Sequence, residues 1–360
     1  MPKRILFFSC EPGGAEVLIP AIRLLEDVPG IDVTTTGYGY ALERFSKKHV
    51  SYAEIAPINL QDPYLFNFFA PDMIITSAAS LPGFDMSEKH LWIQAKRRGI
   101  PTMAMLDQWQ NYTERFSGEG ADERLAYMPD WINCLNETGR TAMLNEGFEA
   151  RRLVMMGHPY LSSLKSDLAT LDVTSLRISQ RIEASEQVAL FVSEPIREHY
   201  GLKRGYDQYQ VLDYFLTSLA GVHFRQKIII KLHPKDNRTS FVSISNKFPS
   251  LRVQFIYDEI SPLECLAISD YIFGMSSLML VEAYVLGKRV ASLQPGLLAC
   301  DPMVLSRCQL IPSITNFDQK DLLKLEFRAG TPFEVEFRSK KFIEFILRGM
   351  SSPHSIEQAK

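Results

Sequence analysis

A lysine and a histidine that could bind a phosphate stand two residues apart at the end of an apolar run. The run is Lys227–Ile230, and Lys231, Leu232, His233 and Pro234 follow it. Side chains alternate along a strand, so Lys231 and His233 are expected on the same side of its carboxyl end. Pro234 ends the strand by removing a backbone donor. A cation beside a titratable imidazole suits the phosphate of a nucleotide, which His233 would hydrogen-bond or protonate.

Two serines form a second candidate anion site. Ser276 and Ser277 follow the apolar segment Tyr271–Gly274 and open a helical run that contains Glu282. Either serine can cap that helix, and the N–H groups at a helix start attract anions. Glu282 lies about one and a half turns further on. Its carboxylate would reach ribose hydroxyls there, unless it is only a solvated helix residue.

A third segment, near the N-terminus, contains two glycines at the start of an expected helix. Glu11, Pro12, Gly13 and Gly14 follow the strand candidate Arg4–Ser9. Glycines let a backbone approach a ligand closely, so Gly13 and Gly14 are candidate donor contacts. The segment matches neither the GxGxxG nor the Walker pattern. A tight turn that Pro12 helps to start explains it equally well.

Asp107 is the best candidate for a general base, because it follows an apolar run at an expected strand end. A carboxylate in this position could act as a general base and take a proton from a reacting hydroxyl group. Glu11 is the main rival, and a helix cap is the structural alternative for Asp107. The nearby Trp109, Tyr112 and Arg115 would stack on or grip an acceptor sugar, although aromatic residues in such a loop are as often packing residues.

Alternating strands and helices must position these residues. Apolar runs that end in polar or glycine residues and alternate with helical segments are typical of βαβ units. The strand candidates are 4–9, 31–36, 73–76, 101–106, 131–135, 153–156, 188–192, 227–232, 253–256, 271–274 and 289–293. The helix candidates are 15–25, 41–48, 87–98, 137–146, 206–219, 240–247, 262–268, 277–286 and 341–347. Ligands of doubly wound sheets bind beyond the carboxyl ends of the strands, which is where the candidate residues fall.

The chain is long enough for two domains. Its 360 residues are about twice a typical domain length, and the sequence turns polar and loses strand character between Ser163 and Gln187. We therefore predict an α/β protein with two Rossmann-like domains facing across a cleft. The predicted boundaries are 1–165 for the N-terminal acceptor-side domain, 166–187 for a linker, 188–340 for the C-terminal nucleotide-sugar domain, and 341–360 for a C-terminal helix and tail.

Composition argues against several classes of protein. The formal net charge is −3 and no block of like charge occurs, which argues against a general nucleic-acid binder. The apolar stretch after the first basic residues is too short for a signal peptide or a membrane span. We expect a cytoplasmic protein with at most peripheral membrane contact. The five cysteines contain no CxxC pair, so neither a disulfide framework nor a zinc site is indicated.

Several of these segments together resemble a known superfamily. The segments are His233-Pro234, Tyr257-Asp258-Glu259, Ser269-Asp270-Tyr271, Ser276-Ser277 and Glu282. Between residues 188 and 295 the chain resembles the C-terminal donor domain of bacterial GT-B enzymes. These include capsule, lipopolysaccharide and sialic-acid transferases and the glycerophosphotransferases of teichoic-acid synthesis. The resemblance implies that the histidine and the serine pair hold the phosphate of the donor, which is commonly CMP-linked.

Two further segments resemble GT-B elements. Gly157-His158-Pro159 looks like the G-x-P element that closes many N-terminal GT-B domains, and Ser193-Glu194-Pro195 looks like the entry loop of the donor domain. Ser193, Glu194 and the following Arg197 thereby become candidate donor contacts. The acidic D/E-D/E-G motif of one sialyltransferase group is not found. The catalytic residue therefore stays open between Asp107, Glu11 and His233.

The resemblance implies an inverting glycosyltransferase of polysaccharide biosynthesis. It would move a sugar, such as a sialic acid or Kdo, from a CMP- or UDP-linked donor to a surface glycan or glycoconjugate. Lys231, His233 and the serine pair would neutralise the donor phosphate, so neither a metal nor a cofactor is expected. Three alternatives stay open: a polyol-phosphate transferase of the teichoic-acid type, a nucleotide-sugar 2-epimerase that needs no separate acceptor, and a non-catalytic nucleotide-sugar-binding protein.

Overall fold

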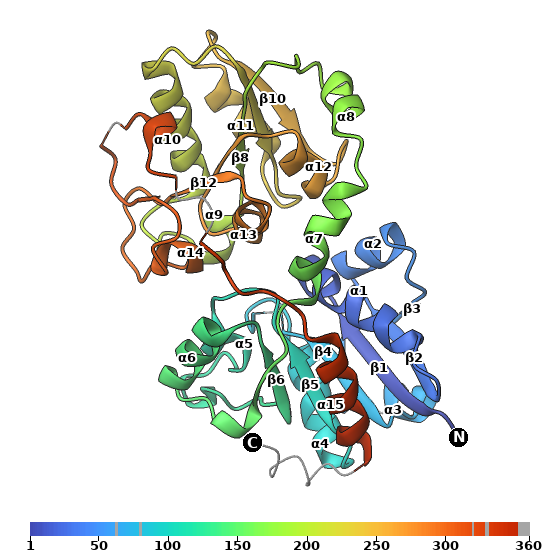
Figure 1. Ribbon diagram of the computed structural model, residues 1–360. Helices are drawn as coiled ribbons and strands as arrows, with labels where there is room; N and C mark the ends of the chain where they lie inside the picture. Colours follow the sequence, from blue (N-terminus) through green and yellow to red (C-terminus); the bar gives the residue numbers. More distant parts are fainter. Residues whose placement is uncertain (62–63, 79–80, 319, 328–330, 352–360) are drawn as a thin grey trace. The chain divides into compact units, whose positions relative to one another are not determined.

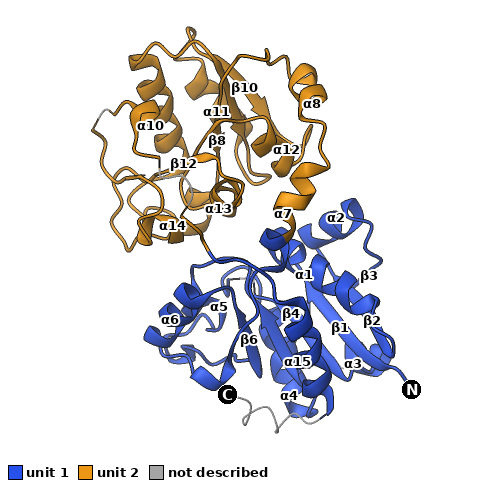
Figure 2. Ribbon diagram, in the orientation of Figure 1, with its two compact units in different colours: residues 1–162, 334–360 blue, residues 163–333 orange. Residues whose placement is uncertain are grey.

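The chain folds into two compact units. The computed structural model describes residues 1–61, 64–78, 81–318, 320–327 and 331–351 (Figure 1). Unit 1 comprises residues 1–162 and 334–360, and unit 2 comprises residues 163–333 (Figure 2). The chain therefore leaves unit 1 within one helix, α7 (Pro159–Ala169), and later returns to it.

Unit 1 is built on a parallel sheet. Its described residues form seven strands in the order β3-β2-β1-β4-β5-β6-β7. Their bounds are β1 Lys3–Ser9, β2 Ile31–Gly37, β3 Ala53–Glu54, β4 Met73–Ser77, β5 Thr102–Met105, β6 Trp131–Cys134 and β7 Leu153–Met155. Strands β4, β5 and β6 are buried along their whole length, as expected of a parallel sheet covered on both faces.

Unit 2 repeats this plan. Its described residues form six parallel strands in the order β10-β9-β8-β11-β12-β13. Their bounds are β8 Val188–Val192, β9 Lys227–Lys231, β10 Arg252–Ile256, β11 Tyr271–Gly274, β12 Arg289–Leu293 and β13 Ser313–Ile314. Apolar residues of β8, β9 and β11 pack against α10 in one buried core.

Helices connect the strands and cover the sheets (Figure 1). Those of unit 1 are α1 Pro12–Glu26, α2 Tyr40–Lys47, α3 Tyr64–Phe69, α4 Ser87–Arg97, α5 Tyr112–Arg115, α6 Glu137–Asn145 and α15 Ser339–Ser351. Those of unit 2 are α8 Val173–Ser179, α9 Ile196–Tyr200, α10 Gln208–Gly221, α11 Arg238–Ser245, α12 Pro262–Ala267, α13 Leu278–Val285 and α14 Val304–Arg307. Short 3-10 turns occur at Ala121–Glu123, Ala150–Arg152 and Leu322–Lys324.

The predicted α/β class with two Rossmann-like domains is confirmed. The structure differs from the sequence prediction mainly at the ends of unit 2. Residues 166–187, predicted as a linker, contain the end of α7 and all of α8 and belong to unit 2. Residues 334–340 belong to unit 1, because the Arg338 N–H donates to Met156 O at 2.8 Å and the His158 N–H donates to Val335 O at 3.0 Å. The predicted tail beyond residue 351 lies outside the described residues.

Candidate functional site

The candidate phosphate-binding residues of unit 2 lie at the switch point of its sheet. Strand β8 pairs with β9 on one side and with β11 on the other. In a doubly wound sheet, ligands bind beyond the carboxyl ends of strands where the winding reverses in this way. Ser193 and Glu194 follow β8, His233 follows β9, and Ser276 follows β11. The structure therefore brings four predicted donor residues to one edge of the sheet.

Glu194 connects the loop after β8 to the start of α13. Its carboxylate accepts hydrogen bonds from the Ser276 backbone N–H at 2.5 Å and from the Ser276 hydroxyl at 3.1 Å. Ser277 is the N-cap of α13, and its hydroxyl accepts a hydrogen bond from the Met279 N–H at 3.3 Å. Burial raises the pKa of Glu194, while the Ser276 N–H and the Arg204 charge oppose that rise. The start of α13 thus already holds a carboxylate, as a helix start favours.

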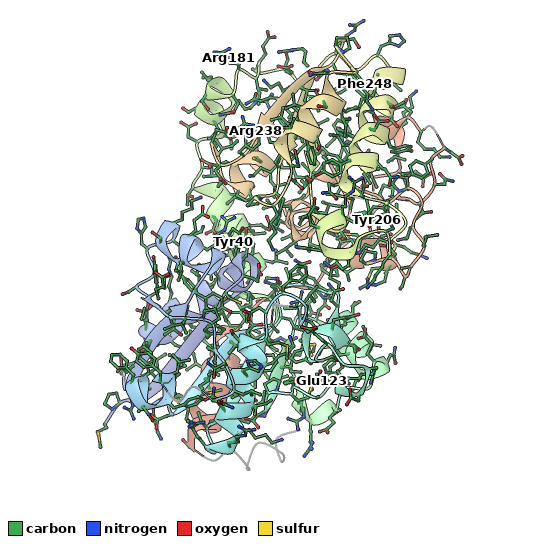
Figure 3. All side chains as sticks on the ribbon, turned by 180° about the vertical axis from the view of Figure 1, so that it is seen from behind. Tyr40, Glu123, Arg181, Tyr206, Arg238 and Phe248 are labelled. Carbon is green, nitrogen blue, oxygen red and sulfur yellow. The ribbon has the colours of Figure 1, made fainter. Side chains whose placement is uncertain are left out.

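Arg204 is a cation that faces this carboxylate. Its Nη1 donates to the Ser276 hydroxyl at 2.8 Å, and its side chain lies over the Tyr200 ring, 3.8 Å from the ring centre. Tyr206, two residues further on, is fully buried in unit 2, and its hydroxyl donates to Gln294 Oε1 (Figure 3). Sequence reasoning missed Arg204, because it lies in an irregular loop and its hydrogen-bond partner is 72 residues away.

His233 is oriented by the turn that follows β9. The Asp236 N–H donates to His233 O at 2.9 Å, which closes a turn with Pro234 at its second position. The Lys235 N–H donates to His233 Nδ1 at 3.1 Å. Nδ1 is therefore the acceptor nitrogen of the neutral ring, and this hydrogen bond assigns the proton to Nε2. His233 accordingly presents an Nε2–H donor, which suits a phosphate oxygen.

Lys235 adds positive charge at this edge, beside a second histidine. His199 Nε2 and Lys235 Nζ are 3.4 Å apart. Burial, and then the Lys235 charge, lower the pKa of His199. Two basic groups this close repel each other when both are charged, so an anion beside them would be stabilising. Neither residue was a predicted contact, although Lys235 directly follows the histidine–proline pair.

Lys231 is held differently from the prediction. Its ammonium donates to the backbone oxygen of Tyr257 and, at 3.4 Å, to that of Leu232. The side chain is 7% exposed, and a buried ammonium needs such acceptors. Ser193, the other residue at this point, donates its backbone N–H to Lys231 O at 3.0 Å and is buried. Lys231 thus joins β9 to the end of β10, and the phosphate contact of His233 stays a prediction.

Of two further predicted donor contacts, Arg197 has an internal partner and Glu282 is buried. The Arg197 Nε donates to Asp207 Oδ2 at 2.9 Å, and its guanidinium lies over the Tyr209 ring. Glu282 is 4% exposed within α13. The structure therefore gives Arg197 a role in fixing the start of α10 and keeps Glu282 inside unit 2, instead of the solvated position that was the alternative.

The glycines of unit 1 are explained by close packing. A Cβ added at Gly14 would lie 2.4 Å from Ser77 Oγ, and one at Gly13 would lie 2.6 Å from Asp107 Oδ2. Only glycine lets the start of α1 approach the ends of β4 and β5 so closely. The predicted approach of a ligand is not needed to explain them. Glu11, the N-cap residue of α1, is partly exposed at the same edge.

Asp107 lies beyond the carboxyl end of β5, as predicted, and is paired with Arg115. Arg115 Nη1 is 2.7 Å from Asp107 Oδ1, and both side chains are 4% exposed. Trp109 and Tyr112 are also buried, and Trp109 Nε1 donates to Asn136 Oδ1 at 2.8 Å. The predicted acceptor contacts Trp109, Tyr112 and Arg115 are therefore internal, because α5 and its preceding loop fold onto unit 1. Asp107 caps no helix.

Sequence reasoning missed a buried polar chain at the ends of β1 and β4. Ser9 Oγ and Ser77 Oγ are 2.9 Å apart, and the Ser77 hydroxyl donates to the Glu88 carboxylate. The adjacent Lys89 is fully buried, and burial lowers the pKa of its ammonium while the Glu88 charge opposes that change. Lysine is almost never fully buried unless it is paired. Glu88 and Lys89 were indistinguishable in sequence from ordinary residues of a helix start.

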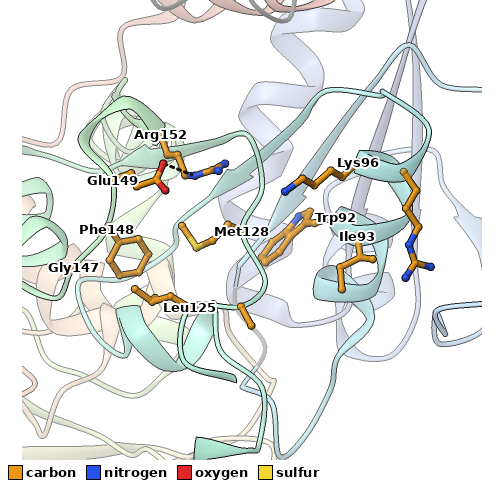
Figure 4. Close-up of a pocket in the computed structure, with 11 residues that line it drawn as sticks. Trp92, Ile93, Lys96, Leu125, Met128, Gly147, Phe148, Glu149 and Arg152 are labelled. Atoms are coloured by element: carbon orange, nitrogen blue, oxygen red, sulfur yellow. Dashed lines mark ion pairs between the residues drawn. The ribbon is translucent and has the colours of Figure 1, made fainter. Parts of the chain in front are cut away.

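A pocket of about 520 Å³ in unit 1 lies away from these residues. It is lined by the second half of α4 and by segments that lead into β6 and β7. Figure 4 shows Lys96 and Arg152 extending into it from different elements, with Trp92 and Met128 between them. Segments that lead into parallel strands lie at the amino edge of the sheet, whereas the candidate site residues follow strands.

Two searches of the described residues gave no result. In ranges 1–61, 64–78, 81–318, 320–327 and 331–351, no three or more His, Cys, Asp or Glu residues form a group suited to a metal ion. Across the same ranges, no helix combines the length and the apolar character needed to cross a membrane.

Solved structures share this fold over nearly the whole chain. The UDP-GlcNAc 2-epimerase of Neisseria meningitidis, bound to UDP-GlcNAc, is 15% identical; the match covers 97% of this chain and 100% of that chain with a TM-score of 0.66. The UDP-GlcNAc 2-epimerase of Methanocaldococcus jannaschii, in complex with UDP-GlcNAc and UDP, is 12% identical, with 97% and 99% covered and a TM-score of 0.66. A glycosyltransferase of Rickettsia africae is 10% identical, with 98% and 90% covered and a TM-score of 0.56. No family model matches the chain, and no curated protein matches it.

These likenesses establish a GT-B-like fold and correct the functional prediction. A glycosyltransferase was predicted first and a nucleotide-sugar 2-epimerase as an alternative. UDP-GlcNAc 2-epimerases match this fold better than the glycosyltransferase does, with TM-scores of 0.66 against 0.56. The prediction that placed a glycosyltransferase before a 2-epimerase was therefore wrong. The prediction rested on His233-Pro234 and Ser276-Ser277, whose residue types suit phosphate binding but do not distinguish one nucleotide-sugar reaction from another.

Proposed function

We propose that this protein is an enzyme that binds a UDP-sugar and inverts the configuration at carbon 2 of the sugar. The observation that carries the proposal is the cation-rich switch point of unit 2, in a fold shared with UDP-GlcNAc 2-epimerases over 97% of the chain. The proposal replaces the sugar-transfer reading, and it needs no acceptor glycan.

The diphosphate of the nucleotide is proposed to bind at the carboxyl edge of the unit 2 sheet. The donors would be His233 Nε2–H, the Lys235 ammonium and the Arg204 guanidinium, with the N–H groups at the start of α13. Charge-assisted hydrogen bonds from such groups are stronger than neutral ones. His199, 3.4 Å from Lys235, would gain a proton more readily once a phosphate is bound beside it.

Inversion at carbon 2 requires that its C–H bond break and re-form on the opposite face. A proton acceptor and a proton donor are therefore needed, and positioned groups of this kind contribute about 10²–10⁴ in rate. Asp107 and Glu11, predicted as candidate bases for a sugar transfer, are the residues that we propose for this proton transfer.

The test is incubation of the purified protein with UDP-GlcNAc in deuterated buffer, followed by proton NMR. We expect the anomeric signal of the C2 epimer to appear and deuterium to enter at carbon 2. Asp107→Asn should slow both by about 100-fold or more. UDP binding without epimer and without deuterium exchange would support a non-catalytic binding protein instead. Absence of UDP binding would contradict the proposed phosphate site itself.

A further inference from the structure

The start of α13 is occupied by the protein's own carboxylate. Glu194 accepts hydrogen bonds from the Ser276 N–H and hydroxyl, at 2.5 and 3.1 Å. Ser276 is also bonded to Arg204 at 2.8 Å, and both Ser276 and Arg204 are more than nine-tenths buried. Glu194 itself is partly exposed. These donors are of the kind that bind phosphate oxygens, so the carboxylate stands where a ligand phosphate would.

We propose that Glu194 is a specificity-determining residue of the phosphate site, and that its carboxylate must be protonated or displaced before a nucleotide diphosphate binds. The inference rests on the proposed binding of a UDP-sugar in unit 2. Within that site, the Glu194 carboxylate competes with the ligand for the Ser276 N–H and for Arg204. Anions that bind these two groups more strongly than a carboxylate does displace it, and weaker anions do not.

The charges around Glu194 determine how binding should depend on pH. From the loop before α10, Arg204 favours the ionised carboxylate, and the buried Tyr206 also interacts with Glu194 electrostatically. From the start of α13, Ser276 and Ser277 contribute hydrogen bonds only. A diphosphate adds negative charge beside Glu194, which favours the protonated carboxyl. Because burial already raises the pKa of Glu194, ligand binding should take up a proton.

The experiment measures UDP affinity by isothermal titration calorimetry from pH 6 to pH 8.5 for the wild type and Glu194→Gln. Glutamine keeps an oxygen that can accept from the Ser276 N–H but carries no charge. We expect the variant to bind UDP about tenfold more tightly at pH 8.5, since a like charge beside the ligand is removed. The difference should shrink towards lower pH, because burial raises the pKa of the wild-type carboxyl and so brings it closer to its neutral form. UDP and His199 are the same in both proteins, so the comparison of the two isolates the carboxyl of Glu194.

Proton uptake is the second measurement. Titrations in two buffers of different ionisation enthalpy should show that the wild type takes up more protons per UDP at pH 8 than Glu194→Gln does. Glu183→Gln is the matched control, because Glu183 is an exposed glutamate of unit 2 that precedes β8. It makes the same change of charge at the amino edge of the sheet and should bind as the wild type does. Thermal unfolding of each variant verifies that it is folded.

The outcomes separate this proposal from the epimerase proposal. Tighter binding by folded Glu194→Gln supports the role of Glu194 even if no epimer forms. Equal or weaker binding by that variant overturns it, even if the wild type epimerises UDP-GlcNAc. If the wild type does not bind UDP but Glu194→Gln does, the Glu194 carboxylate prevents UDP binding, which also supports its role. If neither protein binds UDP or inorganic pyrophosphate, both the phosphate site and the role of Glu194 fall.

Discussion

The local geometry of His233 limits the hydrogen bonds that its side chain can make with a ligand. The Lys235 N–H occupies Nδ1, so the neutral imidazole can only donate through Nε2. A donor fixed in this way binds an anion without changing its own protonation state. The ring would act as an acid only after Nδ1 gained a second proton. That proton would break the hydrogen bond from the Lys235 N–H.

Replacing His233 by asparagine should therefore weaken UDP binding by about tenfold or more, the loss expected for a hydrogen bond to a charged group. Asparagine keeps a group near Nδ1 and removes the Nε2–H. Thermal-shift titration with UDP measures the change, because a ligand of the native state raises its apparent stability. His223→Asn, at an exposed histidine of unit 2, is the control. If both variants bind UDP as the wild type does, His233 is a turn residue and not a ligand contact.

Residues adjacent to strand ends were predictable, and residues that meet across loops were not. His233 follows from the alternation along β9 and from Pro234, and Asp107 follows from the apolar run before it. Arg204 gives no such signal, because its position depends on the loop between α9 and α10. For Lys231, the alternation of side chains along β9 predicts only the side of the strand on which it lies. Its ammonium is buried and therefore binds backbone oxygens.

At the scale of elements, most strands of the central sheets were well predicted, because apolar runs such as those in β8 and β9 mark them. Strands β3 and β13, with two residues each, were missed because two residues have no periodicity. Helix α10 was predicted to begin two residues early, at Tyr206. Its N-cap is Asp207, which accepts from the Tyr209 and Gln210 N–H groups, both at 2.9 Å.

The cap of α10 makes a testable contribution to unit 2. Asp207→Ala should lower the free energy of unfolding by about 1–2 kcal/mol, because two backbone donors lose their acceptor. Asp207→Asn keeps the acceptor and loses only the pairing with Arg197, whose side chain is 55% exposed, so its cost should be about 1 kcal/mol or less. Hydrogen exchange in the first turn of α10, followed by mass spectrometry, reports the difference. Equal loss of protection in both variants would show that the ion pair dominates.

At the scale of the whole molecule, unit 1 is discontinuous in sequence. The chain completes unit 2 and then supplies α15, whose Phe342, Ile346 and Met350 are buried in the same core as α1 and the inner strands. Phe345 also packs against Trp131 in a T-shaped arrangement, with ring centres 5.1 Å apart. The sequence predicted a helix at 341–347 but not its partner. Its apolar face indicates only that the helix is buried against something.

Because α15 packs in the core of unit 1, we expect its buried residues to stabilise unit 1 and not unit 2. Phe342→Ala should lower the free energy of unfolding of unit 1 by about 3–5 kcal/mol. Tryptophan fluorescence isolates this transition, because all three tryptophans, Trp92, Trp109 and Trp131, belong to unit 1. Leu347→Ala, on the same helix but 40% exposed, should change it by about 0.5 kcal/mol or less. A fluorescence transition that does not move in Phe342→Ala would mean that α15 is dispensable to the core of unit 1.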